Sequence, residues 1–275
     1  MAKTKILFIT HEMSPFLELS NIADITRNLP QAMQEKGMEI RILMPRFGNI
    51  NERRNRLHEV IRLSGLNIII NDNDNPLIIK VASIPTARMQ VYFLDNEEYF
   101  QRKYVFNDSH NKFYEDNDER IIFFCKGALE TVKKLGWSPD IVHCHGWMSA
   151  LVPMFMKTIY SEDPTFKNSK IVYSAYESGF EETLNPAFTK KIKMQGIEEL
   201  DYGYFSDGTF DSLQLGAMEH SDALVFGSEN LSEKVNIHLN SSGKPTLNFD
   251  SSGDHDRFQQ FYEELVNEEL ISLVV

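Results

Sequence analysis

The apolar residues of this chain form short continuous runs, separated by stretches with helical spacing. The first run, Lys5–Thr10, is apolar at nearly every position, which is typical of a strand buried on both faces in a parallel sheet. Ile22–Lys36 places apolar residues on one side of a helix, and Gly37 follows where a left-handed C-cap is expected. Glu39–Met44 is the next predicted strand. These segments predict a strand–helix–strand unit with a right-handed crossover.

The same alternation continues to about residue 240. Several short strands are expected between 57 and 94, where Asn71–Asn75 has the composition of a hairpin turn. Alternating strands and helices predict an α/β fold with a doubly wound, mostly parallel sheet. The later helices are predicted over Asp116–Leu135, Met148–Tyr160, Phe210–His220 and Leu231–Leu239, the last capped by Ser228. The later strands are predicted over Asp140–His145, Lys170–Ala175 and Ala223–Phe226.

Ligands of a doubly wound sheet bind beyond the carboxyl ends of its strands. The candidate binding loops are therefore residues 11–21, 145–147, 176–180 and 227–230.

The character of the sequence changes after residue 240. Two segments rich in Ser and Gly are typical of a linker, and apolar residues then recur at helical spacing from Phe258 to Leu270. We therefore expect a domain over residues 1–240, followed by a linker and an amphipathic tail helix over 241–275. The tail helix either packs back on its own domain or binds a partner.

Composition narrows the classes of partner. The chain has 28 basic and 40 acidic residues and a net charge of -12, which argues against nucleic-acid and anionic membrane surfaces. The net charge does not exclude a small local binding site for phosphate. Cys125 and Cys144 lie in apolar runs and are expected to be reduced and buried. The apolar N-terminal run is short for a signal peptide, and no segment has the length of a membrane span, so a cytoplasmic protein is expected.

Three segments resemble glycogen and starch synthases. Ile6–Arg46 contains "HEMSPF", "ADI" and "LPQAMQEKGMEIRILMPRF" in the order found in that family. Pro139–Val152, "PDIVHCHGWMSALV", resembles its "HDWHT" strand-to-helix turn. His220–Val235, "HSDALVFGSENLSEKV", resembles its "ADKVTTVSPTYAKEI" segment. Together the three segments cover most of residues 1–240 with the family's spacing.

The resemblance implies a GT-B fold, in which two Rossmann-like domains face a cleft. It also implies the family reaction, glucosyl transfer from ADP-glucose to an α-1,4-glucan with retention of configuration. The family binds the nucleotide mainly on its C-terminal domain. Only about 35 residues follow position 240, and one βαβ unit alone takes about 30. We therefore expect a single Rossmann-like domain of the N-terminal GT-B type with a helical tail.

The sequence departs from the family at several positions. Glu18, Ser20 and Asn21 stand where the family has Lys-x-Gly-Gly, so a cation and two permissive residues are replaced. Gly146 stands at the acidic position of the His-Asp-Trp motif, and Tyr176 replaces a cleft histidine. Because oriented charges supply most of the rate in such sites, we expect the chain alone not to synthesise a glucan.

The resemblance also implies substrate-binding positions, although no catalytic residue is assigned. Trp147 either stacks on a sugar or packs in the core, and the same alternatives apply to the aromatic residues between 99 and 114. The expected substrate-binding positions are Asp24, His145, Trp147, Tyr176, Glu177 and Ser228.

The sequence gives less support to a metal site or to an acid–base catalytic site than to a substrate-binding site. His143 and His145 point to the same face of a strand, but no third and fourth zinc ligand is spaced nearby. Asp72 and Asp74 fit a solvated hairpin turn better than a metal site. The carboxylates at 177, 181 and 182 show no partner geometry for glycoside hydrolysis. No metal and no cofactor is expected.

Two functions remain open. In the first, the chain is enzymatic: it is half of a split synthase that meets a separate donor domain, or a remnant that keeps weak activity. In the second, it is a non-catalytic module. The module would bind a glucan or a sugar phosphate, or a synthase partner. A homodimer and a tail-capped monomer are both compatible with the sequence.

Overall fold

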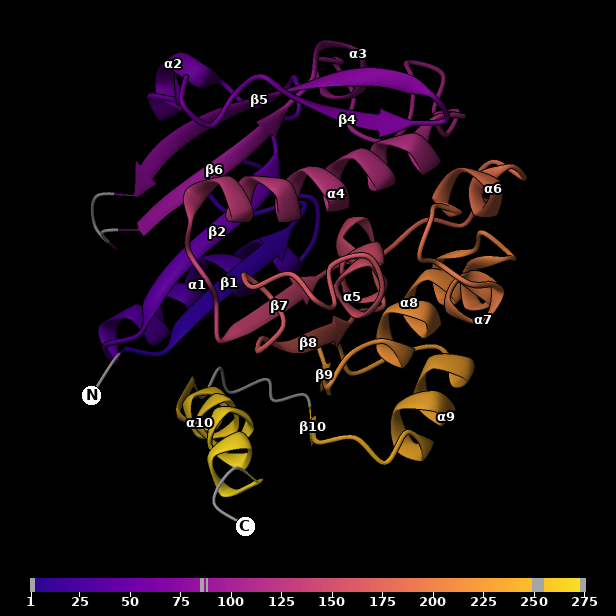
Figure 1. Cartoon of the computed structure of the whole chain (residues 1–275). Helices are drawn as coiled ribbons and strands as arrows, with labels where there is room; N and C mark the ends of the chain where they lie inside the picture. The colour runs from indigo at the N-terminus through magenta and orange to yellow at the C-terminus, as the bar shows by residue number, and fades with distance from the viewer. Residues whose placement is uncertain (1–2, 85–86, 88, 249–254, 273–275) are drawn as a thin grey trace.

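The central sheet of the protein follows the predicted alternation of strands and helices. The computed structural model describes residues 3–84, 87, 89–248 and 255–272, without the side chains beyond 267. The sheet order is β10-β9-β8-β7-β1-β2-β6-β5-β3, with β4 paired to β5 (Figure 1). Strands β10 to β6 of this order are parallel, and β5 is antiparallel to both of its neighbours in this order, β6 and β3. This is the expected α/β, doubly wound and mostly parallel arrangement.

The elements have the following bounds. The strands are β1 (Lys5–Thr10), β2 (Glu39–Pro45), β3 (His58–Glu59), β4 (Leu66–Ile70), β5 (Asn73–Ile84), β6 (Met89–Asp95), β7 (Ile141–His145), β8 (Lys170–Ala175), β9 (Ala223–Phe226) and β10 (Thr246–Leu247). The α-helices are α1 (Ile22–Glu35), α2 (Glu52–Asn55), α3 (Glu97–Phe100), α4 (Asn117–Leu135), α5 (Leu151–Lys157), α6 (Phe188–Ile192), α7 (Glu199–Tyr202), α8 (Phe210–Glu219), α9 (Glu233–Ser241) and α10 (His255–Ser272). Two 3-10 helices are η1 (Trp147–Ser149) and η2 (Gly203–Phe205).

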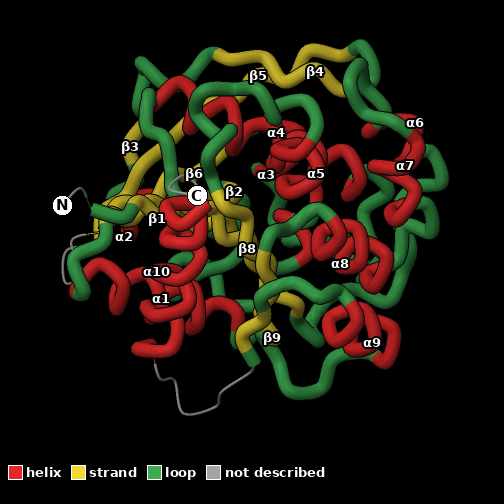
Figure 2. Tube along the Cα trace, turned by 60° about the horizontal axis from the view of Figure 1, so that its bottom comes forward, coloured by secondary structure: helices red, strands yellow, loops and turns green. Residues whose placement is uncertain are grey.

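Helices cover both faces of the sheet because the chain reverses direction across it. The β1–α1–β2 unit moves one way along the sheet, and the β6–α4–β7 connection returns past β1 to its other side. Right-handed crossovers in opposite directions place their helices on opposite faces. Helix α4 accordingly packs with α5, and α5 with α8, whereas α1 packs beside α10 (Figure 2).

The hairpin predicted at Asn71–Asn75 is confirmed. Ile70 pairs with Asn73, so Asn71 and Asp72 form a two-residue loop between β4 and β5. Both loop residues have positive φ, at 49° and 62°, as a type I′ turn requires.

Two helix predictions need correction. The helix expected at Met148–Tyr160 is broken into η1 and the shorter α5, which ends at Lys157. Ser228 does not cap the following helix, because α9 begins later and Ser232 accepts the capping bond from the backbone N–H of Val235. The boundary expected at residue 240 falls within α9, and β10 then extends the main sheet beside β9.

The tail helix α10 packs on the domain. Phe261, Tyr262 and Leu265 are buried on its inner side. Cys125 and Cys144 are free and buried, as expected. Within the described ranges, no helix is long and apolar enough to cross a membrane.

Candidate functional site

The carboxyl ends of β1 and β7 form the point where the strand order reverses. Thr10 of β1 lies opposite His145 of β7 in the parallel register. His11 and Glu12 leave the sheet beside Gly146 and Trp147, so both turns open at the same edge. Open α/β sheets bind their ligands at such a switch point.

Glu12 controls the loop that leads into α1. Its carboxylate, which is almost fully buried, accepts hydrogen bonds from the backbone N–H of Leu19 at 2.6 Å and of Ser20 at 2.8 Å. It also accepts the Ser20 hydroxyl at 2.6 Å. Backbone N–H groups at a helix start are the usual donors to a bound phosphate. Here an internal carboxylate takes two N–H groups of the loop just before the N-cap residue Asn21.

The surface of this loop is acidic. Glu18, Asn21 and Asp24 are exposed, and Ser20 is half-buried. They line a hollow of about 370 Å³ with Leu19 and Ala23. Because two of the lining side chains are carboxylates and none is cationic, an anionic ligand would be repelled there.

Gly146 makes room for His11. Its backbone lies at φ 73° and ψ 167°, a region that is essentially restricted to glycine. A Cβ at this position would lie 2.3 Å from Cε1 and 2.5 Å from Nδ1 of His11. The His11 imidazole therefore occupies the space that any side chain at 146 would need.

His11 is held close to Glu12 and away from solvent. Its Nε2 lies 3.5 Å from Oε1 of Glu12. Burial lowers the pKa of His11, and the Glu12 carboxylate partly counteracts that effect.

His143 and His145 project from the same side of β7, with ring centroids 3.9 Å apart. Both are fully buried, so His145 is not open to solvent. The Nδ1 atom of His145 lies 2.7 Å from the hydroxyl of Tyr176, which is also buried. Burial, and then the nearby His11, lower the pKa of His145 to about 3. The ring is therefore neutral near pH 7 and has no proton to give as an imidazolium.

Trp147 packs in an aromatic cluster beneath the switch point. Its ring centroid lies 4.8 Å from that of Phe106 and 5.0 Å from that of Phe180, and only 2% of the residue is exposed. The Trp147 ring is thus packed in the core in this structure, and stacking on a sugar stays a prediction. Phe113 stacks on Phe180 at 5.0 Å and is half-buried.

A larger hollow opens beside Phe113. It has a volume of about 750 Å³ and lies between the loop before α4 and the loop after β8. Apolar surface from Phe113 and Leu184 meets the carboxylates of Glu181 and Glu182 there, while the Lys112 ammonium is paired with the Glu115 carboxylate at 2.7 Å. Aromatic faces and carboxylate acceptors together suit a neutral polyhydroxylated ligand better than an anion.

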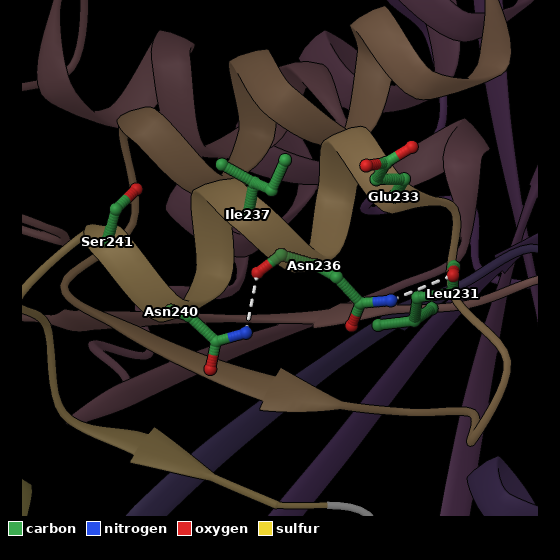
Figure 3. A pocket seen from close by; sticks show the side chains of 6 residues that line it. All are labelled: Leu231, Glu233, Asn236, Ile237, Asn240 and Ser241. Atoms are coloured by element: carbon green, nitrogen blue, oxygen red, sulfur yellow. Dashed lines mark hydrogen bonds between the residues drawn. The ribbon is translucent and has the colours of Figure 1, made fainter.

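A third hollow follows the outer side of α9 (Figure 3). Its asparagine side chains are already used, because Asn236 donates to the backbone carbonyl of Leu231 and Asn240 to that of Asn236, each at 2.8 Å. Ile237 is 61% exposed. This hollow therefore presents the apolar Ile237 side chain, the bonded amides and the exposed Glu233 carboxylate.

The remaining expected positions lie in two groups. The Ser228 hydroxyl is buried and accepts the backbone N–H of Glu177 at 3.3 Å, whereas the Glu177 side chain is exposed. Asp24 lies on α1 in the acidic hollow, whereas His145 and Tyr176 form a buried pair. Among the described residues, no group of three His, Cys, Asp or Glu side chains could hold a metal ion.

His11 and Glu12 lie in the expected candidate loop 11–21, but the sequence did not single them out as individual site residues. Their place directly after β1, at the predicted carboxyl edge, was the available signal.

Comparison with known proteins identifies the family. The profile of the starch synthase catalytic domain matches residues 5–242. The glycogen synthase of Chlorobium limicola is 37% identical over 234 residues, which are 84% of this chain and 47% of that protein. The glycogen synthase of Chlorobaculum tepidum is 41% identical over 204 residues, covering 70% of this chain and 42% of that protein. The chain thus spans about half the length of these curated relatives.

The fold also has a solved counterpart. The catalytic domain of starch synthase IV from Arabidopsis thaliana, solved with ADP and acarbose, superimposes with a TM-score of 0.73 at 18% identity. The match covers 90% of this chain and 51% of that chain. The sheet described above therefore has the fold of the corresponding half of that catalytic domain.

Proposed function

Because this chain belongs to the family of starch synthase catalytic domains, we propose that it serves the glucan side of glycogen or starch synthesis and does not elongate a glucan by itself. The family reaction is glucosyl transfer from ADP-glucose to an α-1,4-glucan. In this proposal the domain binds the glucan, and a second polypeptide segment supplies the binding of the nucleotide sugar.

The observation that carries the proposal is the contact between Glu12 and the loop before α1. Two backbone N–H groups that would suit a diphosphate are bonded to the Glu12 carboxylate. Glu18 and Asp24 add negative charge to the adjoining surface. Loss of one oriented donor lowers the rate of a reaction that develops negative charge by about a hundred- to a thousandfold. Such a loop therefore argues against productive binding of ADP-glucose.

The hollow beside Phe113 supports a role in glucan binding. Sugar rings present C–H faces to aromatic side chains and hydroxyl donors to carboxylates, and Phe113, Glu181 and Glu182 offer both. A sugar phosphate would meet the same carboxylates with like charge. We therefore favour a neutral glucan as the ligand.

A second candidate function is that of a module that docks on a synthase or on a copy of itself. The exposed Ile237 on α9, the last helix of the family match, supports this alternative. A cytoplasmic location belongs to both proposals and is supported by the two free cysteines.

The test is calorimetric titration of the full chain with maltoheptaose and, separately, with ADP-glucose, alongside an assay for glucan synthesis. We expect maltoheptaose to bind, and neither ADP-glucose binding nor elongation to be measurable. The variant Phe113→Ala should weaken maltoheptaose binding by about tenfold, as expected for one lost stacking contact. Robust elongation by the chain alone would refute the proposal.

The matched control is Tyr104→Ala, which removes an aromatic ring that is 41% exposed and does not line this hollow. It should leave maltoheptaose binding unchanged. If no glucan binds and light scattering shows a stable assembly, the docking function replaces the first proposal.

A further inference from the structure

The tail helix α10 covers part of the sheet and lies beyond the segment that the family profile matches. It packs beside α1 on one face (Figure 2). An ion pair between Asp256 and Lys36 joins the first turn of α10 to the end of α1. Phe261, Tyr262 and Leu265 form the buried side of the helix. One short apolar stripe and one surface ion pair therefore contribute to holding the tail in place.

Tyr262 carries a polar contact into this apolar interface. Its hydroxyl lies 2.6 Å from Nδ1 of His143, and Nε2 of His143 lies 2.7 Å from the hydroxyl of Ser174. A neutral imidazole donates from one nitrogen and accepts at the other. The two hydroxyls therefore satisfy both ring nitrogens of a neutral His143.

The surroundings of His143 oppose its protonation. Among the described residues, the titratable groups that face it are His145 on β7 and Tyr262 on α10, while β1 presents Phe8 and β8 presents Ser174. Burial, and then the neighbouring His145, hold the pKa of His143 well below its ordinary value of 6.5. Within the part of these elements whose side chains are described, no carboxylate contacts the ring to offset the effect.

We propose that the tail helix is a pH-sensitive latch, which is docked over His143 while that imidazole is neutral and is released when the imidazole takes up a proton. This inference goes beyond the proposed function and does not depend on it. Departure of α10 would admit water to His143 and let its pKa return toward 6.5. Protons therefore bind the undocked state more strongly than the docked state.

The sign of the pH effect follows from this linkage. Docking is at full strength above about pH 6.5 and weakens as the pH falls below that value, by up to tenfold in the docking equilibrium per pH unit. The Asp256–Lys36 pair titrates in a separate and lower range, because the pKa of Asp256 is lowered from 3.8 by its bond to Lys36. It does not contribute to the change near pH 6.

Departure of the tail helix would also affect the candidate site at the carboxyl end of β7. The His143 ring lies against His145, and His145 is bonded to Tyr176 beside the turn at Gly146. Loss of the Tyr262 hydroxyl removes one of the two partners that fix the His143 ring. The latch thus couples the tail to the carboxyl edge of β7.

The test is hydrogen exchange of the full chain, followed by mass spectrometry between about pH 7.5 and about pH 5 and corrected for intrinsic exchange. Peptides from α10 should lose protection by about tenfold per pH unit below about pH 6.5, and at each pH they should be less protected than β7 and β8. The variant His143→Gln, which cannot titrate, should make α10 protection independent of pH. Equal protection of α10 and β7 at every pH would mean that both exchange only by global unfolding, and it would overturn the proposal.

Two tyrosine variants complete the experiment. Tyr262→Phe should lower α10 protection at the highest pH by about ten- to a hundredfold, because it leaves a buried nitrogen of His143 without a partner. Tyr173→Phe is the matched control, since the buried Tyr173 hydroxyl has no hydrogen-bond partner in the described part of the chain. An unaltered pH profile of α10 in His143→Gln would also overturn the latch. If His143→Gln does not fold, the comparison of α10 with β7 in the unaltered chain decides.

Discussion

Replacing Gly146 by alanine should destabilise the protein strongly, for two separate physical reasons. A residue other than glycine in this region of φ and ψ costs about 1–3 kcal/mol. The new Cβ would also lie 2.3 Å from the His11 ring, and such overpacking of a core costs about 1–3 kcal/mol more. We expect a total loss of about 4 kcal/mol in the free energy of unfolding.

Urea unfolding of a double-mutant cycle separates the two contributions. In His11→Ala/Gly146→Ala the overlap disappears but the backbone strain stays, so the coupling energy should be about 1–3 kcal/mol. Gly136→Ala is the matched control, because Gly136 has φ 62° and a Cβ added there would meet nothing within 4 Å, while left-handed strain alone costs about 1–2 kcal/mol. Additivity within about 0.5 kcal/mol would refute the claim that His11 fills the space at 146.

Three further outcomes are expected. Glu12→Ala should lower the free energy of unfolding by about 2–4 kcal/mol, because two backbone N–H groups lose a charged acceptor. The control Glu18→Ala, at the exposed surface, should change the free energy of unfolding by less than about 0.5 kcal/mol. Cys125 and Cys144 should react with a thiol reagent only on unfolding, since burial raises the pKa of both thiols, and rapid labelling of the native chain would contradict this. The free energy of unfolding should fall as the pH drops from about 6.5 toward 3, because the pKa of His145 is about 3 in the fold. This group alone gives a slope of about 1.4 kcal/mol per pH unit. A urea midpoint that stays constant over that range would be inconsistent with this prediction.

Much of the fold could be predicted because the strands of a parallel sheet are buried on both faces. Lys5–Thr10 and Lys170–Ala175 therefore stand out as apolar runs, and the structure keeps both with unchanged bounds. Prediction failed where local signals compete with distant contacts. Ser228 has the chemistry of a helix cap, but its hydroxyl accepts the backbone N–H of Glu177, 51 positions away.

The candidate site shows the same limit. Motif comparison singled out Gly146 and Glu18 as departures from the family, because each is a substitution at one aligned position. It could not indicate that His11 fills the space beside Gly146, since those residues are 135 positions apart and only the pairing of β1 with β7 brings them together. Helical spacing predicted the tail helix, but not the bond of its Tyr262 hydroxyl to His143.

The central position of β1 constrains the order in which the sheet can assemble during synthesis. Its pairing with β2 needs only the first 45 residues, but its other edge has no partner until β7 has emerged at residue 145. Tyr262 follows His143 by 119 positions. A ribosome that adds roughly 5–20 residues per second therefore synthesises Tyr262 about 6–24 seconds after His143. For that interval the nascent sheet exposes the His143 face to solvent. A chaperone that shields apolar sheet surface would therefore have several seconds in which to bind that face.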